Sequence, residues 1–377
     1  MTTTHPLRLA MVGGGPGAFI GAVHRTAALM DGHFVLVAGA FSSDADKCRE
    51  RAAEWGVAED RAYGSWQAML AGEAALPEGE RADVVCIVTP NHLHHEVAIA
   101  ALDAGFHVAC DKPLTTSSEH AAEVAAAVER SGKLFLLTHN YTGSPMAREA
   151  RELVLQGESG PIGTVRKVYV EYLQGWLATD LEATGQKQAA WRTDPARSGP
   201  GGALGDIGTH AHNLAEFITG MEITGIEGTR RAFVEGRPVD DDAMAFITFE
   251  NGADGTLTCS QVCVGRENGL AIRVFGTKGG LEWHQEHPND LTLYSADGGA
   301  VTKRTGNGYL TPLAQASGRI PPGHPEGYLE AFANLYTDLA HAIRAGEPLP
   351  AHTPSIEAGL RGVRFIEDVI ASSGELG

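Results

Sequence analysis

Short apolar runs alternate with helical stretches along the first 140 residues, and this alternation constrains the fold more than any other feature of the chain. The run Asp83–Thr89 is apolar almost throughout, as is typical of a strand buried on both faces. Strands separated by helices pair in parallel through right-handed crossovers, and the helices cover the sheet. We therefore expect a parallel sheet, with strands at Leu7–Val12, Phe34–Phe41, Asp83–Thr89, Phe106–Cys110 and Lys133–Thr138, and helices from the first turn to about Met30 and at Asp44–Trp55, His94–Ala104 and Ser117–Ser131.

The pattern changes near residue 140. From about Glu222 to Tyr294, strand-like segments and turns follow one another without a helix, which predicts a mostly antiparallel sheet. Residues 297–324 are expected to be rich in loops. A further strand is expected at Val165–Leu173, and helices at Met146–Gln156, Ala203–Thr219, Glu326–Ala345 and Ser355–Ala371. The sequence thus predicts an α/β domain over residues 1–140 and an α+β domain over residues 141–377, with a late helix that packs on the first domain.

Composition narrows the class of protein. The chain has 377 residues, more than one ordinary hydrophobic core holds, which supports two domains. Its 29 basic and 47 acidic residues give a net charge of -18, which opposes binding to nucleic acid or to an anionic membrane. No signal peptide is predicted, and no stretch approaches the roughly 18 apolar residues of a membrane span. Five scattered cysteines are typical of a reducing compartment, so we expect a cytoplasmic protein.

A glycine-rich turn follows the first expected strand and opens the first expected helix. Glycines allow a tight turn and close backbone approach, and a pyrophosphate then binds the N–H groups of the helix start. Two registers remain open: Gly13-x-Gly15-x-x-Ala18, or a longer loop in which Gly21 is the close-packing glycine. The alternative is a tight turn that binds no ligand. We predict a dinucleotide site and assign to it Gly13, Gly15, Pro16, Gly17, Ala18, Phe19 and Ile20.

The acidic residue that would hold the ribose hydroxyls is missing after the second strand. Ser42 and Ser43 stand there, with Asp44 just beyond. Because no arginine follows at once to bind a 2′-phosphate, NAD is favoured. Lys47 and Arg49 are near enough that NADP stays possible.

Polar residues follow two further strands at the edge where open α/β sheets bind ligands. Thr89-Pro90-Asn91 ends one strand and Asp111-Lys112-Pro113 ends another. The histidines after Asn91 lack a carboxylate or cysteine partner at metal-ligand spacing, and Cys259 and Cys263 lack a second pair, so no metal is expected. The residues assigned to the cofactor at these turns are Thr89, Pro90, Asn91, His94, Asp111, Lys112 and Asn140.

Three residues have the chemistry of alcohol oxidation. A hydroxyl proton must leave as hydride passes to nicotinamide, and His210 has a side chain suited to accept it. A cationic Lys112 would stabilise the developing alkoxide. Asp206 precedes His210 by four residues, on one face of the expected helix, and could orient the site or contact substrate. The alternatives are a solvated lysine and a surface ion pair.

The chain resembles the glucose–fructose oxidoreductase / inositol dehydrogenase / MocA family over nearly its full length. The resemblance rests on the glycine turn, Thr89-Pro90-Asn91, Asp111-Lys112-Pro113, Trp191-Arg192 and the segment Gly202–His210. The family usually has Glu where this chain has Asp111, a swap that keeps the charge.

That resemblance implies a Rossmann domain joined to a domain with a large, open, mostly antiparallel sheet, whose exposed face commonly forms dimers and tetramers. It implies Lys112 and His210 as catalytic residues with Asp206 in support, and His324 as a residue that reaches the substrate. The expected walls of a polyol pocket, which could instead be core or interface residues, are Tyr172, Gln174, Trp176, Trp191 and Arg192.

These observations predict an NAD(P)-dependent dehydrogenase that oxidises a ring hydroxyl of an inositol or cyclic sugar to a ketone or lactone. Lys112 and His210 would handle the proton. One alternative is a glycoside-processing enzyme that oxidises its sugar transiently and retains the cofactor. Another is a sugar-sensing regulator that keeps the fold and cofactor, although the presence of both Lys112 and His210 disfavours it.

Overall fold

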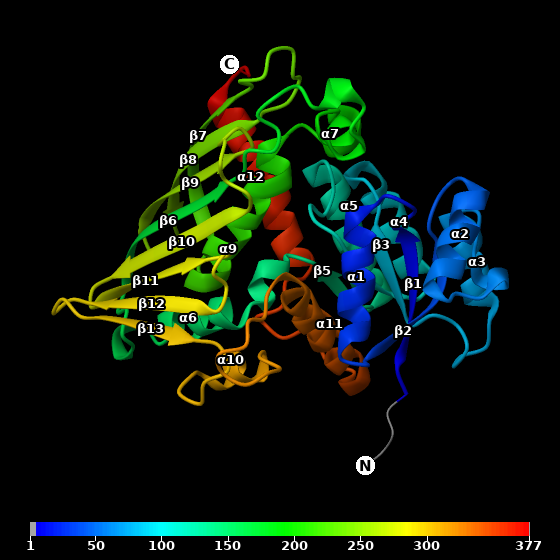
Figure 1. The fold of residues 1–377 in the computed structure, drawn as a ribbon, viewed down its shortest axis with the longest axis horizontal. Coiled ribbons are helices and arrows are strands. Elements are labelled where there is room, and N and C mark those ends of the chain that lie inside the picture. The colour runs from blue at the N-terminus through cyan, green and yellow to red at the C-terminus, as the bar shows by residue number, and fades with distance from the viewer. Residues whose placement is uncertain (1–4, 377) are drawn as a thin grey trace. The chain divides into compact units, whose positions relative to one another are not determined.

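The computed structural model describes residues 5–376, which form two compact units (Figure 1). The first unit comprises the chain up to Asn140 together with Phe332–Leu360. The second comprises Tyr141–Ala331 and the chain from Arg361. None of the helices within residues 5–376 is long and apolar enough to cross a membrane.

The first unit is built on a five-stranded parallel sheet with the order β2-β1-β3-β4-β5. All five residues of β3 are buried, which explains its continuous apolar sequence. The strands are β1 (Leu7–Gly13), β2 (Phe34–Ala40), β3 (Val84–Val88), β4 (His107–Cys110) and β5 (Phe135–Leu137). The helices are α1 (Phe19–Met30), α2 (Ala45–Trp55), α3 (Trp66–Ala75), α4 (His94–Asp103), α5 (Ser118–Ser131) and most of α11 (Tyr328–Ala345).

Local signals begin and end these helices. The Asp44 carboxylate accepts from the backbone N–H groups of Asp46 and Lys47 at the start of α2, and Gly56 ends that helix in a left-handed conformation. The sequence did not predict α3. Its buried residues are Met69, Leu70 and Glu73, too few and too mixed to form an apolar stripe.

The second unit is built on an eight-stranded sheet with the order β13-β12-β11-β10-β6-β9-β8-β7. Every neighbouring pair is antiparallel except β6 and β9, which are parallel. The strands are β6 (Val165–Leu173), β7 (Ile223–Arg231), β8 (Asp242–Phe249), β9 (Asp254–Ser260), β10 (Gly269–Gly276), β11 (Gly279–His284), β12 (Asp290–Ser295) and β13 (Ala300–Arg304). The mostly antiparallel sheet predicted from the sequence is thus confirmed.

One face of this sheet is covered by helices within the unit, as Figure 1 shows for α9 (Thr209–Thr219). Burial alternates along β8, where Ala243, Ala245 and Ile247 face the core and Met244 and Phe246 are exposed. The other helices of this unit are α6 (Pro145–Leu155), α7 (Lys187–Arg192), α8 (Pro195–Ser198), α10 (Pro312–Ala316) and the greater part of α12 (Ile356–Ser373). β13 and α10 lie in the stretch expected to be loops, because an exposed edge strand and a five-residue helix leave little apolar pattern.

Candidate active site

The glycine turn of the first unit depends on close backbone packing. A Cβ on Gly13 would lie 2.8 Å from the Val88 carbonyl oxygen, and one on Gly21 would lie 2.4 Å from the Gly14 Cα. Gly13 and Gly17 also have positive φ angles, of 94° and 77°, which favour glycine. Of the two registers left open, Gly21 therefore has the steric role of the close-packing glycine, and the loop is longer than the short fingerprint.

The start of α1 suits an anion. The residue before the helix is Ala18, whose methyl group provides no acceptor for the N–H groups of the first turn. Phe19 begins the helix and is 62% exposed.

The remaining assigned turns of the first unit lie at one edge of its sheet. Because the five strands are parallel, the residues that follow β1, β2, β3, β4 and β5 share the carboxyl edge. Among the buried side-chain polar atoms of residues 5–376 that have no hydrogen-bond partner, two lie at these turns: Thr89 Oγ1 and Asn140 Nδ2. Buried polar groups are normally paired, so both atoms fit a bound polar ligand such as the predicted dinucleotide.

The turn after β2 contains Ser42 and Ser43. Ser42 Oγ accepts from the Asp44 N–H at 3.2 Å. The Asp44 carboxylate caps α2, and its hydrogen bond with the Lys47 N–H lowers its pKa. Asp44 thus caps its own helix, and it does not take the place of the acidic residue in the dinucleotide fingerprint.

His94 connects two turns of the edge. Its Nδ1 lies 2.8 Å from the Pro113 carbonyl oxygen and its Nε2 lies 2.9 Å from the Thr89 carbonyl oxygen. The ring is fully buried, and burial lowers its pKa. Both ring nitrogens contact backbone, so His94 fixes the turns at Thr89 and Lys112 relative to each other.

A polar network surrounds Asp111, the residue before Lys112. Asp111 accepts from Thr138 Oγ1 at 3.2 Å and forms an ion pair with His24, whose Nε2 is 3.6 Å from the carboxylate. The other His24 nitrogen is 2.7 Å from the Tyr336 hydroxyl and 3.4 Å from Cys86 Sγ. Lys112 itself is partly buried.

Charge within this network is distributed as an imidazolium and a carboxylate. Burial opposes protonation of His24, but its contacts with Cys86 and Asp111 outweigh burial and raise its pKa to about 10. Burial likewise opposes ionisation of Asp111, and the contact with His24 nevertheless lowers its pKa. The strand end that carries Lys112 is therefore held by an ion pair whose imidazole is fully buried and whose carboxylate is partly buried.

In the second unit, Asp206 lies in a π-helical turn, η6 (Leu204–Gly208), that leads directly into α9. The regular α-helical spacing expected between Asp206 and His210 is therefore wrong in detail, because a π turn changes the angular step per residue. Asp206 Oδ2 accepts from Arg192 Nε at 3.1 Å and from Gln261 Nε2 at 2.9 Å. The preceding loop is fixed by Asp240, which accepts from the N–H groups of Gly202 and Leu204.

Arg192 is enclosed by aromatic rings. Its guanidinium carbon lies 4.4 Å from the Trp191 ring centroid and 5.8 Å from that of Trp176. A second bond from Arg192, at 2.7 Å, reaches Gln188 Oε1. The positive charge of Arg192 is thus paired with Asp206 and stacked on indole.

Two tyrosines and an asparagine form a closed ring of hydrogen bonds near His210. Tyr172 OH donates to Asn268 Oδ1 at 2.6 Å, Asn268 Nδ2 donates to Tyr141 OH at 3.1 Å, and the two hydroxyls lie 2.6 Å apart. Burial raises the pKa of Tyr141 to about 12, so both phenols are neutral. Gln174 Nε2 donates to the same Asn268 oxygen at 3.0 Å.

The His210 ring lies beside this hydrogen-bonded ring, with its centroid 4.9 Å from that of Tyr141 and 6.0 Å from that of Tyr172. His324, by contrast, is exposed, and its Nδ1 lies 3.0 Å from the Pro321 carbonyl oxygen. Sequence reasoning overlooked Tyr141, Asn268 and Gln261. They had no motif around them, and only the pairing of distant segments reveals them.

The first unit joins a strand–glycine turn–helix to a cationic strand end, and the second presents a histidine among polar side chains. Together these features define a nicotinamide-dependent oxidoreductase. Residues 7–139 match the model of the oxidoreductase family with an NAD-binding Rossmann fold, and residues 147–282 match the GFO/IDH/MocA C-terminal domain. The chain belongs to the GFO/IDH/MocA family of oxidoreductases, and residues 7–139 are its NAD-binding Rossmann region.

Several relatives share nearly the whole architecture. An uncharacterised oxidoreductase of Bacillus subtilis, YfiI, is 38% identical, over 98% of this chain and 95% of the relative. An inositol dehydrogenase homologue from Azotobacter vinelandii, solved with NAD+, has a TM-score of 0.92 and 36% identity, over 98% of this chain and 96% of that one. The homologue was also solved with NADH and myo-inositol. The levoglucosan dehydrogenase of Pseudarthrobacter phenanthrenivorans is 30% identical over 77% of each chain.

Proposed function

We propose that the protein is an NAD-dependent dehydrogenase that oxidises a ring hydroxyl of an inositol or cyclic sugar to a ketone or lactone. The observation that carries the proposal is the setting of His210, whose ring lies beside the neutral phenols of Tyr141 and Tyr172. Both phenols are hydrogen-bonded to the Asn268 carboxamide. These groups offer both donors and acceptors, as a polyol with several hydroxyls requires. The likeness to a homologue solved with NADH and myo-inositol supports the same substrate class.

Each of the three catalytic residues has a separate role in the proposal. A bound nicotinamide would supply the acceptor for the hydride that leaves the carbinol carbon. The His210 imidazole accepts the hydroxyl proton, and the Lys112 ammonium stabilises the negative charge that develops on the same oxygen. Asp206 orients the site through its bonds to Arg192 and Gln261. Among the expected pocket residues, Gln174, Trp176, Trp191 and Arg192 are proposed to contact the substrate, with Tyr172 behind them.

The substrate is proposed to be uncharged. Arg192 is the cation beside Asp206, and its charge is already paired with that carboxylate and stacked on Trp191. A phosphorylated sugar needs a cation that is available to its phosphate. The indole rings instead suit the apolar C–H face of a neutral ring.

NAD is proposed over NADP. The turn after β2 presents Ser42 and Ser43, and the structure places Asp44 as the cap of α2. Lys47 forms an i, i+3 contact with Asp44, and Arg49 pairs with Asp46, so both cations near the turn already have acidic partners.

The test is formation of reduced cofactor by purified protein against a panel of inositols, free sugars in both enantiomers and methyl glycosides. We expect NADH from at least one polyol, with NADP a poorer acceptor. Protein that binds NAD but reduces it with no member of the panel would contradict a dehydrogenase function. Consumption of a methyl glycoside without net NADH would favour the enzyme that retains its cofactor.

We further propose that the protein forms a homo-oligomer through the open face of the second unit's sheet. Tyr169, Met244, Phe246, Phe275 and Tyr294 are exposed on this face by 36–72%, and large exposed apolar patches commonly mark interfaces. Light scattering during gel filtration is expected to give the mass of a dimer or tetramer, and Phe246→Lys is expected to shift it toward the monomer. A monomer at micromolar concentration of the unaltered chain would contradict this proposal.

A further inference from the structure

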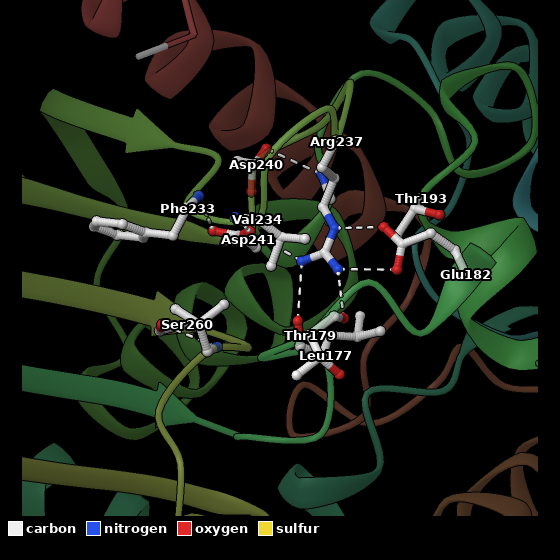
Figure 2. A network of polar contacts seen from close by, with 12 residues as sticks. Leu177, Thr179, Glu182, Thr193, Phe233, Val234, Arg237, Asp240, Asp241 and Ser260 are labelled. Carbon is white, nitrogen blue, oxygen red and sulfur yellow. Dashed lines mark hydrogen bonds and ion pairs between the residues drawn. The ribbon is translucent and has the colours of Figure 1, made fainter. Parts of the chain in front are cut away.

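A buried guanidinium lies in the connection between β7 and β8. The side chain of Arg237 is 1% exposed, and its Nε and Nη2 donate to the two carboxylate oxygens of Glu182 at 2.8 and 3.0 Å. Its Nη1 donates to Asp241 Oδ2 at 2.9 Å. The other two N–H groups donate to the carbonyl oxygens of Leu177 and Thr179 at 3.1 and 3.2 Å (Figure 2). All five donors of the guanidinium thus have acceptors.

The two carboxylates that bind Arg237 differ in how they are fixed. Asp241 directly precedes β8, is fully buried, and accepts from the backbone N–H groups of Phe233 and Val234 at 2.9 and 3.0 Å. Glu182 lies in the stretch that follows β6, residues 176–192, which we call the outer segment. The Glu182 side chain is 18% exposed. Arg237 is therefore anchored to the sheet through Asp241 and restrains the outer segment through Glu182, Leu177 and Thr179.

This anchor is linked to Asp206 by Gln261. The Gln261 N–H donates to the Asp241 carbonyl oxygen at 2.8 Å, and the Gln261 carbonyl oxygen accepts from the Leu177 N–H at 3.2 Å. The Gln261 side chain donates to Asp206 at 2.9 Å. One residue therefore connects the Arg237 anchor, the start of the outer segment and the carboxylate beside the proposed substrate.

The same connection also holds the loop before Asp206. The Asp240 carboxylate accepts from Gly202 N at 3.0 Å and Leu204 N at 2.7 Å, and its carbonyl oxygen accepts from Ala203 N at 2.9 Å. A Cβ on Gly202 would lie 2.0 Å from that carbonyl oxygen, so only glycine allows this approach. Residues 237–241 thus hold the loop that precedes Asp206 and, through Gln261, the start of the outer segment.

We propose that Arg237 is a positioning residue that sets substrate specificity, an inference that rests on the proposed polyol dehydrogenase function. It fixes the segment that begins at Trp176 and leads to Arg192, and so determines where these side chains meet the substrate. A buried ion pair adds little net stability compared with apolar residues of the same size, but it specifies one geometry. A misplacement of about 1 Å in a binding group costs up to about 100-fold in rate or affinity.

The variant Arg237→Lys tests this inference. An ammonium keeps the charge but has three donors on one atom, and it cannot bind both Glu182 oxygens and two carbonyls in the guanidinium geometry. We expect KM for the preferred polyol to rise about 10-fold or more, and the preference over its epimers to narrow, while kcat changes less than about threefold. NADH affinity, a property of the first unit, is expected to stay unchanged.

The matched control is Arg130→Lys. Arg130 also binds one carboxylate through Nε and Nη2, that of Asp103, but its side chain is 56% exposed and lies in the first unit. An exposed pair of this kind contributes little to stability, so the KM and specificity of Arg130→Lys are expected to match those of the unaltered protein.

A second readout does not depend on turnover. Hydrogen exchange of peptides from residues 177–198 is expected to quicken in Arg237→Lys. It is expected to quicken less in Glu182→Gln, which removes only the charge and one of the two acceptor oxygens at position 182. Exchange of first-unit peptides is expected to stay the same. This readout separates the two proposals, since failure of the unaltered chain to oxidise any polyol would contradict the function, whereas exchange reports on the anchor.

Two results would overturn the inference. One is Arg237→Lys activity that falls only with the folded fraction, at unchanged KM and epimer preference. The other is unchanged exchange over residues 177–198 in both variants.

Discussion

Replacing Lys112 by alanine is expected to lower kcat by about 10³-fold, while the Kd for NAD changes less than about threefold. Lys112 follows β4 at the carboxyl edge of the sheet, beside the turns that are proposed to hold the cofactor. In the proposed mechanism its ammonium stabilises charge that appears on the substrate oxygen only during hydride transfer. Loss of such a group lowers kcat and kcat/KM together and leaves ground-state binding largely intact.

Stopped-flow turnover and fluorescence titration with NADH measure the two quantities for Lys112→Ala. Lys133→Ala is the matched control, since Lys133 precedes β5 and so lies at the opposite edge of the same sheet. The control is expected to keep full activity. An equal loss of cofactor affinity and turnover in Lys112→Ala would show that Lys112 binds the cofactor and has no separate role in the chemistry.

Replacing His24 by leucine is expected to lower the free energy of unfolding by about 3–5 kcal/mol, because it leaves the Asp111 carboxylate, which is only 16% exposed, without its cation. His24 is fully buried and contacts Asp111, Thr138, Cys86 and the Tyr336 hydroxyl. Urea unfolding measures the loss. In the double variant with Asp111→Leu, most of the loss is expected to be recovered, since replacement of a whole buried pair by apolar residues is close to neutral.

The contribution of His24 to the free energy of unfolding is expected to fall as the pH rises. The pKa of His24 is about 10 in the folded chain against 6.5 for the free side chain, so the folded state binds the proton more tightly. The stabilisation is therefore complete below pH 6.5 and is lost progressively as pH rises toward 10. The stability difference between the unaltered protein and His24→Leu is expected to shrink over this range. A difference that grows with pH would mean that the imidazole is neutral.

The first unit could be predicted well from the sequence because its signals are local. Buried parallel strands are continuous apolar runs, and the residues after them share an edge, so Thr89 and Lys112 could be placed without coordinates. The long strand Val165–Leu173 was predicted with the bounds that the structure gives it. The edge strand Ala300–Arg304 was missed, since its exposed face leaves no alternation to read.

The polar networks could not be predicted, because each joins segments that are distant in the sequence. Asn268 meets Tyr141 across 127 residues, and Gln261 meets Asp206 across 55. Arg237 lies in a charged stretch that, read alone, is typical of a solvated loop, and only folding shows its side chain to be buried. The π turn at Asp206 likewise depends on Asp240, which lies more than 30 residues further along the chain.

In the proposed reaction, hydride leaves a polyol carbon and ends on released NADH. Its most direct test uses myo-inositol, glucose and other polyols deuterated at their ring carbons, with NMR of the nicotinamide C4 position after turnover with NAD. We expect one deuterium per NADH formed, on a single face of C4, together with one equivalent of ketone or lactone. Deuterium that returns to the sugar product, or exchanges into water without net NADH, would contradict it.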